Sequence, residues 1–529
     1  MAVFNLDKVS WAIEHLYKFH DTDIFPRLFE FKAIKECIAG ATSLFKNKDI
    51  CQWETGALRK FLVPKQLYGF RIATQLDPMD MIAFMSIVLE IGPEIESRRI
   101  HVNKNVVFSN RFQPDDTTHL FFNNKINYLL FRDYCIKKAE EANYVVETDI
   151  SDFYQRIYFH RLENSLAPIR ARYPDHVSAI VKLIKSWNDN ISYGIPIGNN
   201  ASRLLAELVI SDIDNNLIAQ KIDYCRYVDD YKFFCKTKKD AYNNLVFLAN
   251  ILYSSHGLTL SEQKTRIISS EEYVNELCNS EEKIELDRLA DEYQSLLISM
   301  GIGDLYNPID YEKLSEEEKK ALNSLNLFGL LQKQLNEETP NFRMVKFIVN
   351  RLSQIQDPHG VDLLLSKIDC IHPVFSEVIN YLANIVPLLP DKKREEIGAL
   401  LLDSIDNSMI CALPFNKLLI LGLFAGSNYL KNQDKFINLY DKVQDDSLKR
   451  CLILASGLNS QDYWLRLQKG NLKSMSPWVR RAFIYSCSCL PKDEMKNYYS
   501  AIAGNLSNFE KLIIEYAKKN PITNCILSL

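Results

Sequence analysis

The sequence predicts an α+β domain in the first half of the chain and an all-α region in the second. Runs of β-branched and aromatic residues that end in acidic residues indicate the strands of the first half. Apolar residues at helical spacing, without strand alternation, indicate the helices of the second half. The predicted parts are an N-terminal helical segment, an α+β domain, a helical connector and an all-α region, at residues 1–50, 51–279, 280–320 and 321–529.

The first 50 residues carry an apolar stripe. Trp11, Ile13, Leu16 and Tyr17 recur at a spacing that places side chains on one face of a helix. We expect this segment to pack on the domain that follows it. An interface with another molecule is the alternative that the stripe also allows.

A strand is predicted to end at the first acidic position of interest. The β-branched run that begins at Tyr144 leads to Asp149, and the aromatic pair Phe153 and Tyr154 follows directly. An ordinary core strand that ends in a polar turn has the same pattern. The functional interpretation of Asp149 therefore depends on a second acidic site.

That second site is Asp229-Asp230, between two short runs of strand-forming residues. The pattern predicts a β-hairpin with both acids at its tip. Adjacent carboxylates repel each other unless a cation neutralises them, and hard divalent ions bind carboxylate oxygens and substrate phosphates. Carboxylates on adjacent strands, here Asp149 and Asp229, are what a two-metal phosphoryl transfer requires. Taken alone, residues 227–230 could equally form a solvated turn with two exposed aspartates.

Four motifs in this order are similar to those of reverse transcriptases. Tyr227-Val228-Asp229-Asp230 resembles the Tyr-x-Asp-Asp motif, and residues 149–154 resemble the first metal-binding motif. Residues 194–205 resemble the Gly-x-Pro-x-Gly motif that leads into a helix, and residues 257–265 resemble the downstream Leu-x-x-x-Lys-Thr motif. The resemblance covers about residues 55–275 and implies a right-hand polymerase with fingers and palm.

The resemblance also implies a catalytic centre. Its metal site would hold two Mg²⁺ (or Mn²⁺) ions and comprise Asp149, Ile150, Asp229 and Asp230. Lys264 would donate a proton to the leaving pyrophosphate; an exposed lysine without a catalytic role is the alternative. Asp149, Asp229, Asp230 and Lys264 are thus the predicted catalytic residues.

The incoming deoxynucleotide (dNTP) would contact residues of both fingers and palm, namely Lys65, Arg71, Ile150, Tyr154 and Gly198. Lys65 and Arg71 would hold the triphosphate, because cationic donors stabilise charge on phosphate oxygens; an exposed basic face is the alternative. Tyr154 would block a 2′-hydroxyl, unless it is a core aromatic like Phe153, which we expect to be buried.

Ile197 departs from the reverse transcriptase pattern. Many members of the family carry Gln in this slot, where it lines the site for template and nucleotide. Its absence puts ordinary template handling in doubt.

Composition limits the remaining classes. The 12 cysteines include no Cys-x-x-Cys pair, and the first residues lack a secretory pattern, so we expect reduced thiols and a cytoplasmic protein. No apolar run has membrane-spanning length. The net charge of −4 is unlike that of a protein that coats duplex DNA, so any nucleic-acid site must be local.

Beyond residue 280 the pattern becomes helical. An amphipathic helix is predicted through Leu289, Tyr293 and Leu297 to Gly301, and residues 315–318 form a capping box for the next helix. Later helices are entered by prolines, namely Pro358, Pro373, Pro414 and Pro477. A solenoid of HEAT-like helix pairs and a compact bundle both fit this pattern; we expect the solenoid.

A palm followed directly by a large helical region resembles the Abi (abortive infection) group of bacterial phage-exclusion proteins. No thumb, RNase H, integrase or maturase segment is recognisable, and the length is near that of the prophage-encoded member. The resemblance implies template-independent DNA synthesis from dNTPs, primed on a protein Tyr or Ser hydroxyl that stays covalently attached to the product. It also implies a homo-oligomer, a trimer or hexamer.

Two other hypotheses stay open. One is a templated reverse transcriptase of a retron or defence system. The other is a catalytically silent palm that serves as scaffold for a helical binding domain. The intact acids Asp149, Asp229 and Asp230 argue against the second of these.

Overall fold

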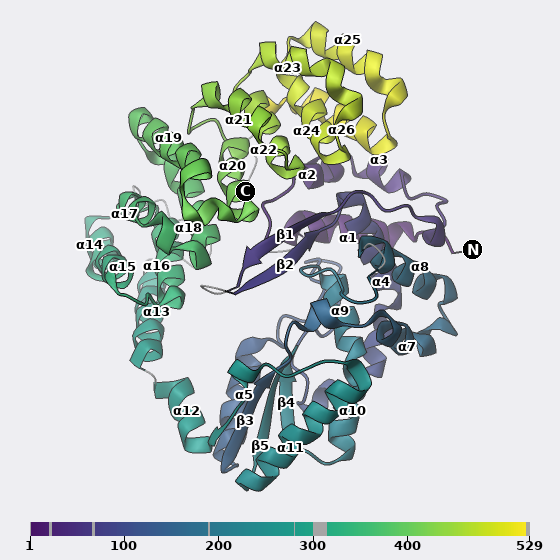
Figure 1. The fold of residues 1–529 in the computed structure, drawn as a ribbon, viewed down its shortest axis with the longest axis vertical. Coiled ribbons are helices and arrows are strands. Elements are labelled where there is room, and N and C mark those ends of the chain that lie inside the picture. The colour runs from purple at the N-terminus through teal and green to yellow at the C-terminus, as the bar shows by residue number, and fades with distance from the viewer. Residues whose placement is uncertain are drawn as a thin grey trace. The chain divides into compact units, whose positions relative to one another are not determined.

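The computed structural model describes residues 2–20, 24–65, 69–188, 191–279, 281–299 and 315–524 (Figure 1). The chain forms two compact units, and each unit consists of several stretches of sequence. The first unit comprises Met1–Asp23, Ile38–Leu58 and Thr74–Ile284. The second comprises Ile24–Cys37, Arg59–Ala73 and Glu285–Leu529. The domain ranges expected from the sequence stay a prediction.

A four-stranded antiparallel sheet organises the first unit, in the order β4-β5-β3-β6. Its strands are β3 (Tyr144–Asp149), β4 (Tyr224–Tyr227), β5 (Asp230–Cys235) and β6 (Arg266–Ser269). The hairpin predicted around the Asp-Asp pair is confirmed, because β4 and β5 pair across it. The strand predicted to end at Asp149 is confirmed as β3.

Helices of the first unit cover this sheet and extend away from it. They are α1 (Leu6–Phe19), α3 (Ile38–Ser43), α4 (Pro78–Arg98), α5 (Tyr128–Glu140), α6 (Phe153–Arg156), α7 (Phe159–Arg170), α8 (Pro174–Trp187), α9 (Asn200–Val209), α10 (Ser211–Ala219), α11 (Lys238–Ile251) and α12 (Ser270–Asn279). Phe131 and Cys135 of α5 pack with Val145, Cys225 and Phe234 of the sheet in one apolar core. The opposite face of β5 buries Tyr231 and Phe233.

The predicted N-terminal helix is α1, which packs on α4. Trp11, Ile13 and Leu16 are buried there. Tyr17, the fourth residue of the predicted stripe, is exposed instead. The packing role expected for this segment is therefore confirmed for three of its four apolar residues.

The second unit combines a hairpin with many helices. The hairpin is formed by β1 (Arg59–Pro64) and β2 (Phe70–Gln75). The helices are α2 (Phe29–Glu36), α13 (Glu281–Ser299), α14 (Glu316–Ser324), α15 (Leu327–Asn336), α16 (Phe342–Gln354), α17 (Gly360–Ser366), α18 (Phe375–Ile385), α19 (Asp391–Asn407), α20 (Pro414–Gly426), α21 (Phe436–Lys442), α22 (Asp446–Leu458), α23 (Asp462–Gln468), α24 (Pro477–Ser486), α25 (Lys492–Ile502) and α26 (Asn508–Lys519).

Several predictions for this helical region are confirmed. Leu289, Tyr293 and Leu297 are buried, Ser315 and Glu318 form the expected capping interactions, and α20 and α24 begin at prolines. Of the other two predicted starts, Pro358 lies two residues before α17 and Pro373 lies in a 3-10 turn before α18, so neither begins an α-helix. Gly301, the expected helix stop, lies outside the described residues. No helix in the described part of the chain has both the length and the apolar character needed to span a bilayer.

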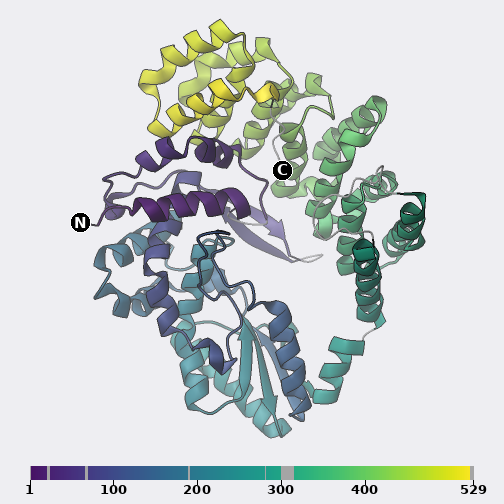
Figure 2. The same cartoon turned by 180° about the vertical axis from the view of Figure 1, so that it is seen from behind.

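Helices of the second unit pack in an alternating order. Every second helix is in contact: α16 contacts α18, α18 contacts α20, α20 contacts α22, α22 contacts α24, and α24 contacts α26. Figures 1 and 2 show the helices following one another in chain order, from green to yellow. Contact between every second helix is what a solenoid of helix pairs requires. HEAT-like repeats remain a prediction that this packing supports.

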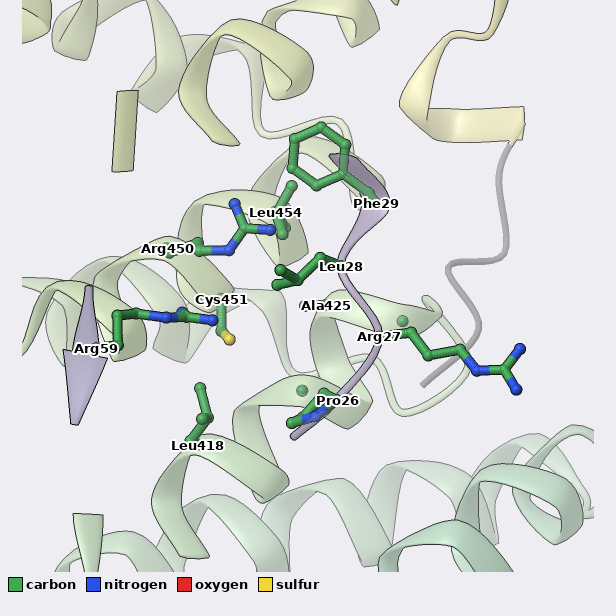
Figure 3. Close-up of a pocket in the computed structure, with 12 residues that line it drawn as sticks. Pro26, Arg27, Leu28, Phe29, Arg59, Leu418, Ala425, Arg450, Cys451 and Leu454 are labelled. Atoms are coloured by element: carbon green, nitrogen blue, oxygen red, sulfur yellow. The ribbon is translucent and has the colours of Figure 1, made fainter. Parts of the chain in front are cut away.

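The β1–β2 hairpin is anchored within the second unit by aromatic residues. Phe61 of β1 packs against Phe25 and Phe415, with ring centroids 5.8 and 6.3 Å away. The guanidinium of Arg59 lies 4.1 Å from the ring centroid of Trp478. Figure 3 shows a small pocket beside this anchor, lined in part by Arg59, Arg450, Leu28, Cys451 and Leu418. The hairpin and the C-terminal helices therefore share one core.

Candidate active site

Strand pairing brings three carboxylates to one end of the sheet. Asp149, the last residue of β3, is the register partner of Asp230, the first residue of β5. The Ile150 backbone N–H donates to the carbonyl of Asp229 at 3.1 Å, which fixes the turn against the end of β3. Three of the predicted catalytic residues thus come together from two separate segments of the chain.

The turn that carries the acids has an unusual backbone at Val228. Its φ is +57°, in the left-handed region that β-branched residues avoid. The Val228 N–H donates to Ser109 Oγ at 2.9 Å, and Arg226 Nη1 donates to the Val228 carbonyl at 3.0 Å. Both backbone groups of this residue are therefore held by side chains from outside the turn.

Behind the turn lies a buried ionic network. Arg226 is fully buried and donates to both oxygens of Asp214, at 2.8 and 2.6 Å, and to Glu207 at 2.8 Å. Glu207 also accepts hydrogen bonds from Arg99 at 2.9 Å and from the Ser109 hydroxyl. Two guanidinium groups thus balance two carboxylates, as buried charges require. Burial favours neutral Glu207, but the two arginines outweigh it and lower the pKa of its carboxyl.

The environment of the acids disfavours their negative charge. Burial, and then the charge of Asp149, raise the pKa of Asp229 from its usual 3.8 to about 7. Burial also raises the pKa of Asp230, although Lys232 opposes this effect. Carboxylates in such a place gain from a nearby cation.

Two lysines supply cations to this site. Lys264 Nζ pairs with Asp149 and is itself half-exposed. Lys232 Nζ lies 2.9 Å from Asp230 and 2.8 Å from Glu147. Burial disfavours the charge of each ammonium, but the carboxylates outweigh it and raise the pKa of both lysines.

The donor set fits a hard divalent ion in its chemistry, because it consists of carboxylate oxygens that repel each other. Among the described residues, however, no three His, Cys, Asp or Glu side chains are arranged as a ready-made metal site. Asp149 and Asp230 are each engaged by a lysine. Metal binding at these acids would compete with Lys264 and Lys232.

Three of the residues predicted to bind nucleotide, Ile150, Tyr154 and Gly198, belong to the first unit, as the acids do. Tyr154 is partly exposed in α6 while its neighbour Phe153 is buried, and Tyr154 interacts electrostatically with Arg203 and Asp229. Burial raises the pKa of the Tyr154 hydroxyl. The Ile150 side chain is buried, so only its backbone is open to a ligand. Gly198 has a φ of +122°, a conformation that favours glycine in the loop before α9.

The other two nucleotide-binding candidates belong to the second unit. Lys65 follows β1, and its backbone N–H donates to the Gly69 carbonyl at 2.8 Å. Arg71 is the second residue of β2, and both side chains are exposed. They are therefore not among the residues that the first unit brings together.

Sequence reasoning missed the residues that support the catalytic turn. Lys232 was hidden within a strand-forming run, and Arg226, Glu207 and Ser109 lie far apart in the sequence. The sequence offered one signal for Arg226. It is a charged residue inside the strand-forming run before the Asp-Asp pair, and a buried charge requires partners.

Part of the chain matches a model of a known protein family. Residues 99–300 match the family model described as reverse transcriptase (RNA-dependent DNA polymerase). Among solved structures, apo telomerase from Candida tropicalis is similar with a TM-score of 0.31 and 11% identity, covering 70% of each chain. Telomerase from Candida albicans, in complex with a TWJ fragment of telomeric RNA, gives 0.30 and 11%, covering 76% of this chain and 70% of that one. No curated protein matches.

Proposed function

From the reverse transcriptase domain at residues 99–300, we propose that this protein is a DNA nucleotidyltransferase that joins dNTPs by two-metal phosphoryl transfer. The observation that carries the proposal is the convergence of Asp149, Asp229 and Asp230 where β3 and β5 pair. Partly buried carboxylates that repel each other are costly to a fold, and a polymerase is a function that uses them.

Each residue of the site has a role in this proposal. Asp149, Asp229 and Asp230, with the backbone of Ile150, hold two Mg²⁺ or Mn²⁺ ions. When bound, such ions neutralise charge on the transferred phosphate and polarise its oxygens. Lys264 exchanges its contact with Asp149 for the leaving pyrophosphate and gives it a proton.

The remaining candidates hold the nucleotide. The Tyr154 ring lies against the sugar and leaves no room for a 2′-hydroxyl. Gly198 allows the backbone before α9 to approach the ligand closely. Lys65 and Arg71 bind the triphosphate through charge-assisted hydrogen bonds.

We further propose template-independent synthesis, primed on a Tyr or Ser hydroxyl of the protein, in an anti-phage system of the abortive-infection type, by a homo-oligomer. Three observations support this finer proposal. The net charge of −4 suits a duplex-binding groove poorly, and Ile197 stands where many reverse transcriptases have Gln. A helical region, of the kind expected for HEAT-like repeats, follows the palm where a thumb would begin.

A templated RNA-directed DNA polymerase of a retron or defence system is the second candidate. The matched family model, described as an RNA-dependent DNA polymerase, favours it. A catalytically silent palm that supports a helical binding domain is the third. The lysine contacts to Asp149 and Asp230 favour that candidate, because they stabilise the acids without a metal.

One experiment separates the three. Nuclease-treated protein is incubated with labelled dNTPs and Mg²⁺ or Mn²⁺, with and without a primer-template, beside the Asp229→Asn variant. Label attached to the protein without added nucleic acid, and absent from the variant, is the expected result. Incorporation that needs the primer-template and copies it would support the templated enzyme. No incorporation under either condition would support the silent palm.

A further inference from the structure

Two segments next to the carboxylates form a short antiparallel ladder. The N–H groups of Gly194 and Ile195 donate to the carbonyls of Ile157 and Tyr154, at 2.8 and 2.9 Å. Within this ladder Tyr158 lies directly opposite Tyr193. Directly opposed residues of an antiparallel pair have Cβ atoms about 4.5–5.5 Å apart on one face. The two tyrosines are therefore neighbours on the same surface.

Both rings of this tyrosine pair face solvent. Tyr158 is 45% exposed and Tyr193 is 54% exposed, whereas Ile157, Phe159 and Ile195 of the same ladder are buried. The buried residues suffice to anchor the ladder. The exposed pair thus presents two aromatic side chains that the fold does not need for its core.

The pair lines a groove of about 640 Å³ in the first unit. Its other lining residues are Asp152, Gln155, Arg156, His160, Arg161, Ser255, His256 and Gly257. Two arginines, two histidines and one carboxylate line the groove. Two carboxylates outside the lining pair with three of these groups: Asp212 lies 3.7 Å from Arg161 and 2.9 Å from His256, and Glu163 lies 3.7 Å from His160. The side chain of Arg156 is 54% exposed and 3.8 Å from Asp152, so it can reach a ligand at little cost.

The groove adjoins the strand end that carries Asp149. Asp152 and Arg156 follow Asp149 within seven residues of sequence. The Ser151 N–H donates to the Thr259 carbonyl at 2.9 Å, which ties this segment to the loop of Gly257 on the rim of the groove. A ligand in the groove would therefore lie alongside the segment that connects to the catalytic acid.

We infer that this groove binds a single strand of nucleic acid, with bases stacked on Tyr158 and Tyr193 and phosphates on Arg156 and Arg161. Aromatic rings beside a few cations are the features with which proteins hold single strands, because every unpaired base has a face to stack. A duplex hides those faces and requires more phosphate contacts. The inference rests on the proposed function in one respect: the bound strand would be a substrate or product of the polymerase.

The test measures binding apart from synthesis. Nuclease-treated full-length protein in the Asp229→Asn background is titrated against a fluorescent oligo-dT, and anisotropy is recorded at several salt concentrations. Tyr158→Ala and Tyr193→Ala are each expected to weaken binding roughly tenfold. The corresponding Phe variants keep the ring and should bind like the parent. Arg156→Gln should make the slope of log affinity against log salt about 0.7 less steep.

Tyr242→Ala is the matched control, since Tyr242 is an exposed tyrosine of the same unit that does not line the groove. Unchanged affinity in both groove variants would overturn the inference, as would an equal loss in the control or no binding by the parent. Crosslinking of a bromodeoxyuridine oligonucleotide to the peptides that hold Tyr158 and Tyr193 provides a second readout. Groove-dependent binding by a protein that incorporates no dNTP would overturn the proposed function alone.

Discussion

At the tip of the β4–β5 hairpin, Asp229 occupies a place that disfavours its charge. Asp229→Asn removes that charge with almost no change in shape. We expect incorporation of dNTPs to fall to background, because a two-metal site loses a ligand. We also expect the melting temperature to rise by about 2–4 °C for each 1 kcal/mol of repulsion removed. Activity assays and calorimetry on the same preparation test both effects.

The control for this prediction is Asp116→Asn, which changes an exposed carboxylate of the same unit that does not line the groove. It should leave both activity and stability close to those of the parent. Full activity of the Asp229→Asn protein would exclude the metal role proposed for this residue.

In the proposed function Tyr154 selects the sugar, and its side chain is partly exposed while that of Phe153 is buried. Tyr154→Ala should increase the use of ribonucleotides relative to deoxynucleotides, because it removes the bulk that would meet a 2′-hydroxyl. Tyr154→Phe keeps that bulk and should behave like the parent. Incorporation in competing dNTP and rNTP mixtures gives the ratio. An unchanged ratio in the Ala variant would assign selection to another residue.

Asp80 gives the first unit a dependence on pH. Burial, and then the charge of Asp77, raise the pKa of Asp80 from its usual 3.8 to about 7. Between these values the folded protein binds more protons than the unfolded chain, so the free energy of unfolding should fall as pH rises, by up to about 1.4 kcal/mol per unit.

Asp80→Asn should remove this contribution. The variant should be less stable by an amount that does not change with pH. Asp80 accepts hydrogen bonds from Trp53 at 2.9 Å and from Trp187 at 3.2 Å, and an amide has one acceptor oxygen fewer than a carboxylate. The free energy of unfolding of the variant, minus that of the parent, should therefore increase between about pH 4 and 7. Denaturant titrations across this window measure it. A difference independent of pH would contradict the assignment.

The strand end and the hairpin that carry the acids could be predicted from the sequence, whereas the contacts that support them could not, for a physical reason. Asp149 and Asp229 each end a local strand pattern, so nearby residues sufficed to place them. Lys232 acts through the register that sets it opposite Glu147, and Arg226 acts through α9 and α10, which hold Glu207 and Asp214. Contacts of that kind depend on tertiary packing, which a local pattern does not contain.

At the scale of elements, the β1–β2 hairpin depends on a distant helix. Phe415 of α20 is buried against Phe61 and Phe25. Phe415→Ala should lower the free energy of unfolding by about 3–5 kcal/mol, as large-to-small changes of buried aromatics do. It should also speed hydrogen exchange in residues 59–64, measured by mass spectrometry. Tyr463→Ala, at an exposed site of the same unit, should do neither.

The same hairpin shows where the sequence was uninformative about domain organisation. Its alternating residues indicate a strand, and in β1 they do bury Arg59, Phe61 and Val63. Nothing local indicates that two partners of this face, Phe415 and Trp478, lie beyond residue 285. The helices of the C-terminal region were more predictable, because apolar spacing and proline starts are properties of each helix alone.

At the scale of the molecule, the second unit is assembled from both ends of the chain. Glu30 is fully buried and accepts from Arg450 at 3.0 and 2.7 Å and from Arg481 at 3.2 Å. Burial opposes the charge of Glu30, but the arginines outweigh it and lower the pKa of its carboxyl. Removing the partners of a buried ion commonly costs about 3–5 kcal/mol. We therefore expect residues 24–37 and 59–73 to need residues 285–529 to stay folded.

A fragment of residues 1–284 tests this dependence. It contains the whole four-stranded sheet but leaves Glu30 without Arg450 and Arg481, and exposes the apolar face of β1. We expect it to melt at a lower temperature than the full chain, to associate on size-exclusion chromatography, and to regain stability when residues 285–529 are co-expressed. Glu30→Gln in the fragment should recover part of the loss, because it removes the unpaired charge. A monomeric fragment that unfolds cooperatively at the melting temperature of the full chain would show instead that the polymerase half is an independent domain.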